Sequence, residues 1–161
     1  MASRSAKPLI RWLTAGDLPA AMEVLEEAFE GAERYWSTRL LGYLETLVAE
    51  IDGRVVGVAE IYETEARGYG RLGVVSYLAV KREFRRMGVG RSLVEAAEKI
   101  FRERGCAYVA ASTRKSNKAS QALFRKLGYE LYERGSRVFE DLEGPLYAYR
   151  DDVVMLKKLS V

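Results

Sequence analysis

Histidine is absent from the 161 residues of this chain, and Cys106 is its single cysteine. The commonest metal ligand and the commonest general base are therefore missing, so acid–base chemistry must rely on Glu, Asp, Tyr, Cys, Lys or water. One cysteine excludes an internal disulfide and a cysteine-rich metal site. We expect no metal centre, and a lone cysteine suits a reducing compartment.

Side-chain amides are almost as scarce, because Asn117 and Gln121 are the only two in the chain. This scarcity, together with abundant Arg and Glu, is typical of proteins from hot environments. No apolar run approaches the roughly 20 residues of a membrane span, and the first residues contain no apolar core of signal-peptide length. We therefore expect a cytoplasmic protein with no membrane partner. The mild net charge of +3, with bases interleaved among acids, predicts no nucleic-acid partner either.

The composition, 48% hydrophobic and 30% charged, is that of an ordinary globular protein. The length suits a single domain over residues 1–161 with one sizeable core. Apolar periodicities then place its elements. In chain order they predict a strand at 9–13, a helix from 18 to about 31, a short helix within 33–43, strands at 47–51, 55–62 and 72–80, a helix at 89–105, a strand at 108–112, a helix at 117–126, and strands at 129–139 and 151–159.

These elements predict a mixed α/β (α+β) fold. Asp52-Gly53 between two apolar runs is a strong signal for a tight hairpin, so the three strands from Leu47 to Val80 should be antiparallel. The strand, helix and strand from Val75 to Ser112 should form a right-handed parallel crossover. We expect one mixed, mostly antiparallel sheet of about seven strands flanked by about four helices, with Glu98 on the outer face of its helix.

The stretch from Val75 to Arg91 reads VSYLAVKREFRRMGVGR and joins an apolar strand to a helix through a turn rich in arginine and glycine. Gly88 and Gly90 let a ligand approach the backbone, and the first turn of a helix offers unpaired N–H groups to an anion. Two arginines before the glycines favour a polyanion. The Lys-Ser/Thr pair of a P-loop and the G-x-G-x-x-G of dinucleotide sites are both missing. The stretch predicts a phosphate site of another kind, with a glycine-bearing turn and solvated arginines as the alternative.

Two motifs resemble those of the GNAT superfamily of acetyl-CoA-dependent N-acetyltransferases. Arg85-x-x-Gly88-x-Gly90 matches the pattern Gln/Arg-x-x-Gly-x-Gly/Ala, and the segment Ser116 to Tyr129, SNKASQALFRKLGY, resembles the second motif of the superfamily. They stand in the family's order, separated by a helix and a strand, and the resemblance covers about Val55 to Leu159. The C-terminal half is most similar to enzymes that acetylate protein N-termini, including bacterial ribosomal-protein acetyltransferases and their archaeal relatives.

The resemblance implies the GNAT fold, acetyl-CoA as cosubstrate and a set of cofactor contacts. It implies that Leu78, Ala79 and Val80 present backbone groups to the pantetheine arm and the thioester carbonyl. The residues that would bind the pyrophosphate are Arg85, Arg86, Met87, Gly88, Val89, Gly90 and Arg91. Asn117 and Phe124 would line the far side of the cofactor groove, although they could equally be a helix cap and a core residue.

The usual catalytic pair of the family does not carry over. The N-terminal branch has a Glu in the strand before the Asn motif and a Tyr in the following helix, where this chain has Ser112 and Phe124. Other members place a Glu early in the cofactor-binding strand, at about Val74 here. A catalytic acid or base must therefore come from elsewhere in this sequence.

The hairpin centred near Gly68 supplies candidates. If it pairs Glu60 with Ser76, then Glu60 and Tyr62 lie on one face of the strand, toward the substrate amine. We predict Glu60 as a water-mediated base and Tyr62 as a proton donor or orienting group, with Tyr77 as a rival. The alternative is that Glu60 and Tyr62 are ordinary solvent-facing residues.

Four residues in two aromatic loops are the predicted acceptor contacts: Glu33, Tyr35, Tyr147 and Tyr149. The resemblance implies transfer of acetyl to a primary amine, first of all the N-terminal α-amine of a protein or peptide. Acetylation of a small amine or an amino acid, and a non-catalytic acetyl-CoA-binding module, are the alternatives. Both loops could instead be packing or dimer surface, so a homodimer is one of the open arrangements.

Overall fold

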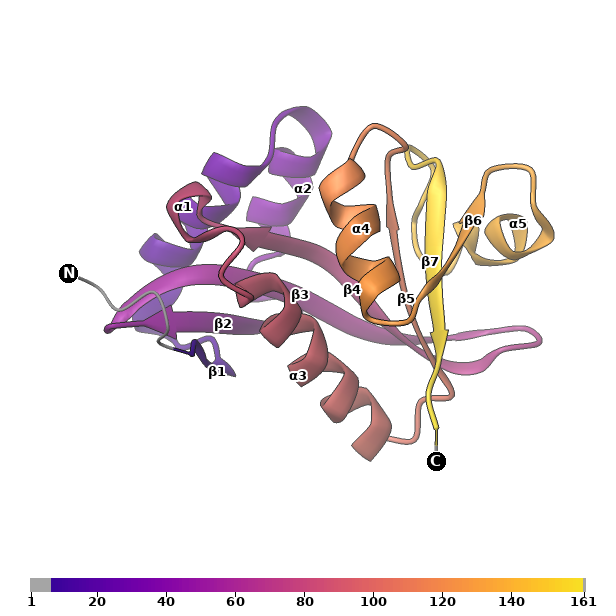
Figure 1. The fold of residues 1–161 in the computed structure, drawn as a ribbon, viewed down its shortest axis with the longest axis horizontal. Coiled ribbons are helices and arrows are strands. Elements are labelled where there is room, and N and C mark those ends of the chain that lie inside the picture. Colours follow the sequence, from indigo (N-terminus) through magenta and orange to yellow (C-terminus); the bar gives the residue numbers. More distant parts are fainter. Residues whose placement is uncertain (1–6, 161) are drawn as a thin grey trace. The chain divides into compact units, whose positions relative to one another are not determined.

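A computed structural model describes residues 7–160, which form one mixed sheet of seven strands and five α-helices (Figure 1). The strand order is β1-β2-β3-β4-β5-β7-β6, with the β4–β5 pair parallel and the β1–β2, β2–β3, β5–β7 and β6–β7 pairs antiparallel. The strands are β1 (Leu9–Trp12), β2 (Glu45–Ile51), β3 (Arg54–Ala66), β4 (Gly70–Val80), β5 (Tyr108–Thr113), β6 (Glu130–Glu133) and β7 (Val153–Lys158). The predicted fold class is confirmed.

The helices are α1 (Leu18–Ala28), α2 (Gly31–Leu40), α3 (Val89–Glu103), α4 (Lys118–Lys126) and α5 (Arg137–Glu143). Two short 3₁₀ turns, η1 (Ala15–Asp17) and η2 (Arg82–Phe84), precede α1 and α3. Among residues 7–160, none of the helices has the length and apolar character needed to cross a membrane.

The chain divides into two compact units that alternate along the sequence. The first contains the residues up to Ile61 and Tyr77–Ala97, and the second contains Tyr62–Ser76 and the residues from Glu98 onward. Strands β3 and β4 and helix α3 each contribute residues to both units.

The core of the first unit lies under α1. Val24 and Leu25 of this helix pack against Val48 of β2 and Val58 of β3, and α1 also packs against α2 (Figure 1). Gly57 lies on the opposite side of β3, where an added Cβ would come within 2.8 Å of Val89 in α3. The glycine therefore permits close packing of α3 against this strand.

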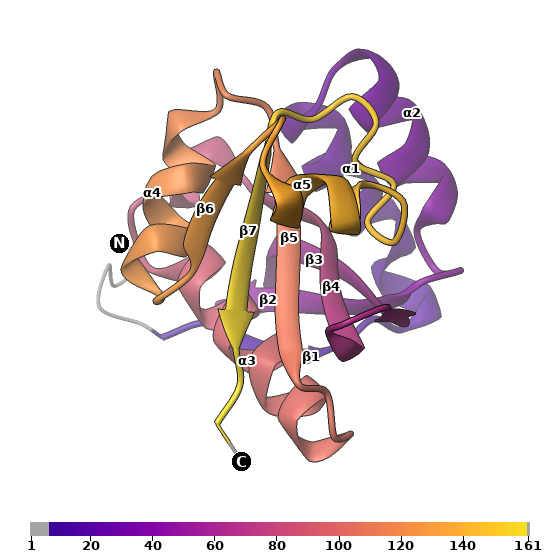
Figure 2. The same ribbon diagram turned by 90° about the vertical axis from the view of Figure 1, so that its right-hand side faces the viewer.

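The core of the second unit is built around β7, which alternates between two environments. Val154 and Leu156 pack with Phe139 and Leu142 of α5, which lies in front of β5 and β7 in Figure 2. The intervening Lys157 forms an ion pair with Glu98 at 3.2 Å. Strand β7 thus packs apolar side chains against α5, and on its opposite face it places a charged side chain next to Glu98 of α3.

The predicted strand over 129–139 and the predicted loop over 140–150 are each only partly correct. Strand β6 ends at Glu133, and α5 replaces the end of the predicted strand and the beginning of the predicted loop. Gly135 adopts a left-handed φ of 99°, and the Ser136 hydroxyl accepts a hydrogen bond from the Phe139 N–H, 3.2 Å away, as the N-cap of α5. This turn and cap stop the strand and begin a helix.

The prediction that Glu98 lies on the outer face of its helix is also wrong. Glu98 is buried, and its carboxylate accepts a 2.6 Å hydrogen bond from the Tyr129 hydroxyl in addition to its ion pair with Lys157. The burial of the Tyr129 ring and the nearby carboxylate raise the pKa of the Tyr129 hydroxyl far above its ordinary value.

Replacing Gly73 with Ala should strongly destabilise the second unit. An added Cβ would lie 2.3–2.6 Å from ring atoms of Phe101, which is fully buried. We expect Gly73→Ala to lower the free energy of unfolding by about 2–3 kcal/mol, measured by denaturant titration. Gly16→Ala is the control, because the nearest atom to its added Cβ is 4.0 Å away. Equal unfolding midpoints for the two variants would contradict the tight packing at Gly73.

Candidate active site

The arginine- and glycine-rich turn between β4 and α3 has an unusual backbone. Arg86 and Gly88 both adopt left-handed φ angles, 64° and 80°, and α3 begins at Val89 as predicted. No atom lies within 4 Å of a Cβ added at Gly88, so its φ angle rather than crowding favours glycine there. Left-handed residues next to a helix start turn successive backbone N–H groups toward one anion.

The side chains of this turn are compatible with a pyrophosphate ligand. Arg85 and Arg86 are exposed, and Arg85 Nε donates a 3.1 Å hydrogen bond to the carbonyl of Val80. Arg91, in the first turn of α3, lies 3.6 Å from Glu95. A left-handed φ costs a non-glycine residue such as Arg86 about 1 kcal/mol. Residues with such strained backbones cluster at functional sites.

The end of β4 presents the three residues predicted to contact the pantetheine arm. Ala79 is buried in the core under α1, whereas Leu78 and Val80 are half-buried. The side chain of Ala79 is therefore part of the core packing, and the predicted contacts of all three residues with the cofactor are made by their backbone groups. Tyr77, the rival catalytic candidate, stacks edge-to-face with Phe29 at 5.8 Å.

Glu60 is the most unusual ionisable residue of the first unit. It lies in β3 opposite Thr46, its side chain is 0% exposed, and neither carboxylate oxygen has a hydrogen-bond partner among residues 7–160. Burial disfavours the charged form and raises the pKa of Glu60 from 4.5 to about 8. The alternative that Glu60 faces solvent is therefore wrong, and its role as a general base stays a prediction.

Tyr62 is placed differently from Glu60. Its hydroxyl donates a 2.8 Å hydrogen bond to the carbonyl of Pro145, and its ring meets the Tyr147 ring edge-to-face at 6.3 Å. Tyr62 thus supports the loop that carries Tyr147, and its role as a proton donor stays a prediction.

The two side-chain amides of the sequence organise one turn of the second unit. The Oδ1 atom of Asn117 caps α4 by accepting a 3.1 Å hydrogen bond from the Ser120 N–H. The Nε2 atom of Gln121 lies 2.9–3.3 Å from the carbonyl oxygens of Arg114, Lys115 and Asn117. Asn117 is exposed as well as capping, so its predicted contact with the cofactor groove remains compatible with the cap.

Phe124 and Ser112 occupy the positions where the resemblance expects the catalytic Tyr and Glu. Phe124 is 2% exposed and packs edge-to-face on Tyr129 at 4.9 Å, so within this unit it is a core residue. The Ser112 hydroxyl donates a 2.6 Å hydrogen bond to the Asp151 carboxylate. The sequence carries no short-range signal for this pair, because the two residues are 39 positions apart.

The predicted acceptor residues of the first unit lie in a helix rather than a loop. Glu33 is in the first turn of α2, and Tyr35 follows it with 49% of its surface exposed. The Arg39 guanidinium stacks on the Tyr35 ring at 4.1 Å, and Trp36 meets the same ring edge-to-face. This arrangement is an exposed aromatic surface held by helical spacing.

Tyr147 and Tyr149, the predicted acceptor residues of the second unit, are 75% and 63% exposed. They follow α5, in the segment that leads to β7. Tyr147 has a left-handed φ of 53°, which is uncommon for an aromatic residue.

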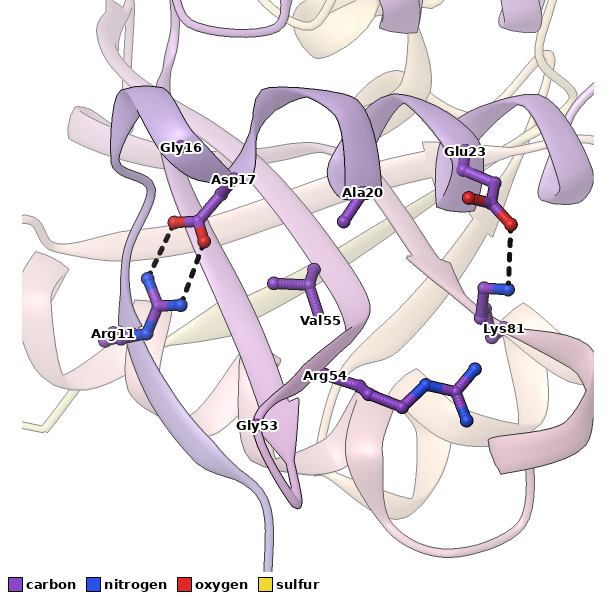
Figure 3. Close-up of a pocket in the computed structure, with 9 residues that line it drawn as sticks. All are labelled: Arg11, Gly16, Asp17, Ala20, Glu23, Gly53, Arg54, Val55 and Lys81. Atoms are coloured by element: carbon purple, nitrogen blue, oxygen red, sulfur yellow. Dashed lines mark hydrogen bonds and ion pairs between the residues drawn. The ribbon is translucent and has the colours of Figure 1, made fainter.

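A pocket of about 350 Å³ in the first unit contains none of the predicted site residues (Figure 3). Two ion pairs lie among the residues that line the pocket: Arg11 with Asp17 at 2.7 Å, and Lys81 with Glu23 at 3.2 Å. The Arg11 hydrogen bonds hold the pKa of the Asp17 carboxyl far below its usual range. These ion pairs link η1 to β1 and α1 to the residue that follows β4.

Comparison with known proteins links these features to one family. Residues 10–129 match the model of the acetyltransferase (GNAT) family. An uncharacterized N-acetyltransferase from Methanocaldococcus jannaschii is 32% identical over 156 residues, which cover 93% of this chain and 91% of that protein.

Two solved structures from Escherichia coli share the fold. The ribosomal-protein-S18-alanine N-acetyltransferase is 22% identical with a TM-score of 0.69, covering 96% of this chain and 95% of that chain. The GNAT-family N-acetyltransferase YhbS, in complex with CoA, is also 22% identical, with a TM-score of 0.71 and coverage of 99% and 86%.

The raised pKa of Glu60 predicts a pH-dependent stability. Between pH 4.5 and about 8 the unfolded chain releases a proton that the folded chain retains, so rising pH destabilises the fold and the full penalty is reached above pH 8. Glu60→Gln removes this penalty. We expect the stability of the variant relative to wild type to increase by up to about 5 kcal/mol from pH 4 to pH 9.

Denaturant unfolding at several pH values measures this difference. Glu65→Gln is the matched control, because Glu65 lies in the same strand but is exposed. If the stability relative to wild type changed with pH equally in both variants, or changed in neither of them, the Glu60 pKa would not be raised by the fold.

Proposed function

This chain belongs to the acetyltransferase (GNAT) family and is an acetyl-CoA-dependent N-acetyltransferase; from that premise, we propose that its acceptor is the N-terminal α-amine of a protein or peptide. The observation that carries the proposal is the exposure of Tyr147 and Tyr149. Aromatic side chains so open to solvent suit an extended chain, whereas a small amine is usually bound in an enclosed pocket. The fold shared with the ribosomal-protein-S18-alanine N-acetyltransferase supports the same class of acceptor.

In this proposal, acetyl-CoA is bound by the turn between β4 and α3 and by the end of β4. The exposed arginines and the left-handed backbone at Arg86 and Gly88 bind the pyrophosphate of acetyl-CoA. A backbone N–H of the Leu78–Val80 segment donates to the thioester oxygen as negative charge develops on it. Such a donor typically contributes about 3 kcal/mol to the stabilisation of the transition state.

Glu60 is the proposed general base. The neutral amine attacks the thioester carbonyl carbon, a C–N bond forms, and the C–S bond breaks to release the CoA thiolate, which takes up a proton. The Glu60 carboxylate accepts the proton of the amine through a water molecule. Its pKa of about 8 makes it a stronger base than an ordinary glutamate while leaving a useful ionised fraction at neutral pH.

An acceptor panel tests the proposal. We expect acetyl-CoA turnover with short peptides of varied first residue, with kcat/KM at least about a hundredfold above that for free amino acids or polyamines. Thiol release and mass spectrometry of the products measure it. Each peptide is compared with its N-terminally blocked form, which should be inert. Equal turnover of blocked peptides, or a preference for small amines, would overturn the N-terminal assignment.

Glu60→Gln should lower kcat/KM by about 100-fold or more. Because both Glu60 and the acceptor amine must lose a proton, log(kcat/KM) of the wild type should rise with a slope near two at low pH. The variant should retain only the slope of one that belongs to the amine. Glu65→Gln is the control and should keep the wild-type profile. A Glu60→Gln enzyme with wild-type kcat/KM would remove Glu60 from the mechanism.

A further inference from the structure

Arg134, which directly follows β6, gathers several carbonyl groups of one loop. We call residues 144–152, between α5 and β7, the tyrosine loop. The Nη2 atom of Arg134 donates to the carbonyl oxygens of Ala148, Tyr149 and Asp151. Its Nη1 atom donates to the Glu143 carboxylate at 2.9 Å. One guanidinium therefore spans both ends of the loop.

The tyrosine loop alternates between buried and exposed side chains. Leu146 is 6% exposed and Ala148 is 0% exposed, and both belong to the core of the second unit. Tyr147 and Tyr149, between and after them, project into solvent. The left-handed φ of Tyr147 persists only where the surroundings hold the backbone in place.

Two further contacts restrain the same loop. The Tyr62 hydroxyl donates to the Pro145 carbonyl, and its ring supports the ring of Tyr147. At the other end, Ser112 donates to the Asp151 carboxylate. The loop is therefore held at its beginning, its middle and its end by groups of the second unit.

We infer that Arg134 is a positioning residue that sets the tyrosine loop in its peptide-binding conformation before the acceptor arrives. The inference rests on the proposed peptide acceptor. A loop ordered in advance loses no conformational freedom on binding, so more of the contact energy appears as affinity. Arg134 touches neither reacting atom in this role and acts through Tyr147 and Tyr149.

The positioning role of Arg134 depends on the shape of its guanidinium group and not on its charge alone. Its planar fork can serve several acceptors at once, and it also lies over the Phe139 ring, 4.6 Å from its centre. A lysine at this position would keep the charge but lose most of these simultaneous hydrogen bonds. Arg134→Lys is therefore the informative variant.

Steady-state kinetics with the best peptide of the acceptor panel test the inference. We expect Arg134→Lys to raise the KM for the peptide about tenfold, with kcat within about twofold of wild type and the KM for acetyl-CoA unchanged. Arg137→Lys is the control, because Arg137 is 93% exposed and makes one distant ion pair, with Asp141 at 3.8 Å. It should keep all wild-type constants. An unchanged peptide KM in Arg134→Lys would overturn the positioning role.

Hydrogen exchange of the whole chain separates this inference from the acceptor assignment. In the wild type, the Tyr147 N–H donates to Gly144 and the Ala148 N–H donates to Glu143, so both amides should be protected. Arg134→Lys should increase their exchange at least about tenfold while leaving the amides of β5 and β7 unchanged. Fast exchange of the loop in the wild type, or equal protection in the variant, would refute the preset loop whatever the acceptor.

Failure of the peptide acceptor and failure of the positioning role of Arg134 therefore give different results. Turnover of small amines alone, with the exchange result as expected, would reject the peptide acceptor and with it the binding role of Arg134. Peptide turnover with an unprotected loop would keep the proposed function and reject Arg134 as a positioning residue. A uniform rise of exchange across the second unit would mean that Arg134 only stabilises the fold, and would also reject it.

Discussion

The proposed chemistry depends on the burial of one carboxyl group, that of Glu60. A buried carboxylate without a hydrogen-bond partner is costly, so the core of the first unit tolerates this group mainly in its neutral form. Asp17, in the same unit, shows the opposite case, because the Arg11 guanidinium lowers its pKa. Two carboxyl groups in one unit are thus driven in opposite directions by whether a cation reaches them. In a chain without histidine, burial alone raises the pKa of Glu60 to about 8.

The features that the sequence predicted correctly have causes within a few residues. Asp52 and Gly53 have left-handed φ angles of 50° and 78° between β2 and β3, as a tight hairpin requires. The start of α3 at Val89 follows from the glycine before it, and the cap of α4 follows from Asn117. Local backbone preference decides these positions, so a single sequence contains the necessary information.

The environment of Glu98, which the sequence does not predict, depends on residues far apart in the chain. Glu98 reads as a surface residue by helical periodicity, yet its partners Tyr129 and Lys157 lie 31 and 59 positions away. The short length of β6 has a local cause, the turn at Gly135 and the cap at Ser136, but the apolar residues of α5 fit a strand pattern equally well. The sequence indicates Glu60 only through its position in the strand. Nothing in the sequence indicates that its carboxyl group is buried without a partner.

In two turns of the second unit, several backbone carbonyl groups converge on one point. A different side chain donates hydrogen bonds to them in each turn. Gln121 serves three carbonyls before α4, and Arg134 serves three carbonyls of the tyrosine loop. Only a side chain with more than one N–H donor can do this, and a glutamate at either place would add an acceptor instead. Gln121 belongs to α4 and Arg134 directly follows β6, so each turn is fixed by a donor on or next to a regular element.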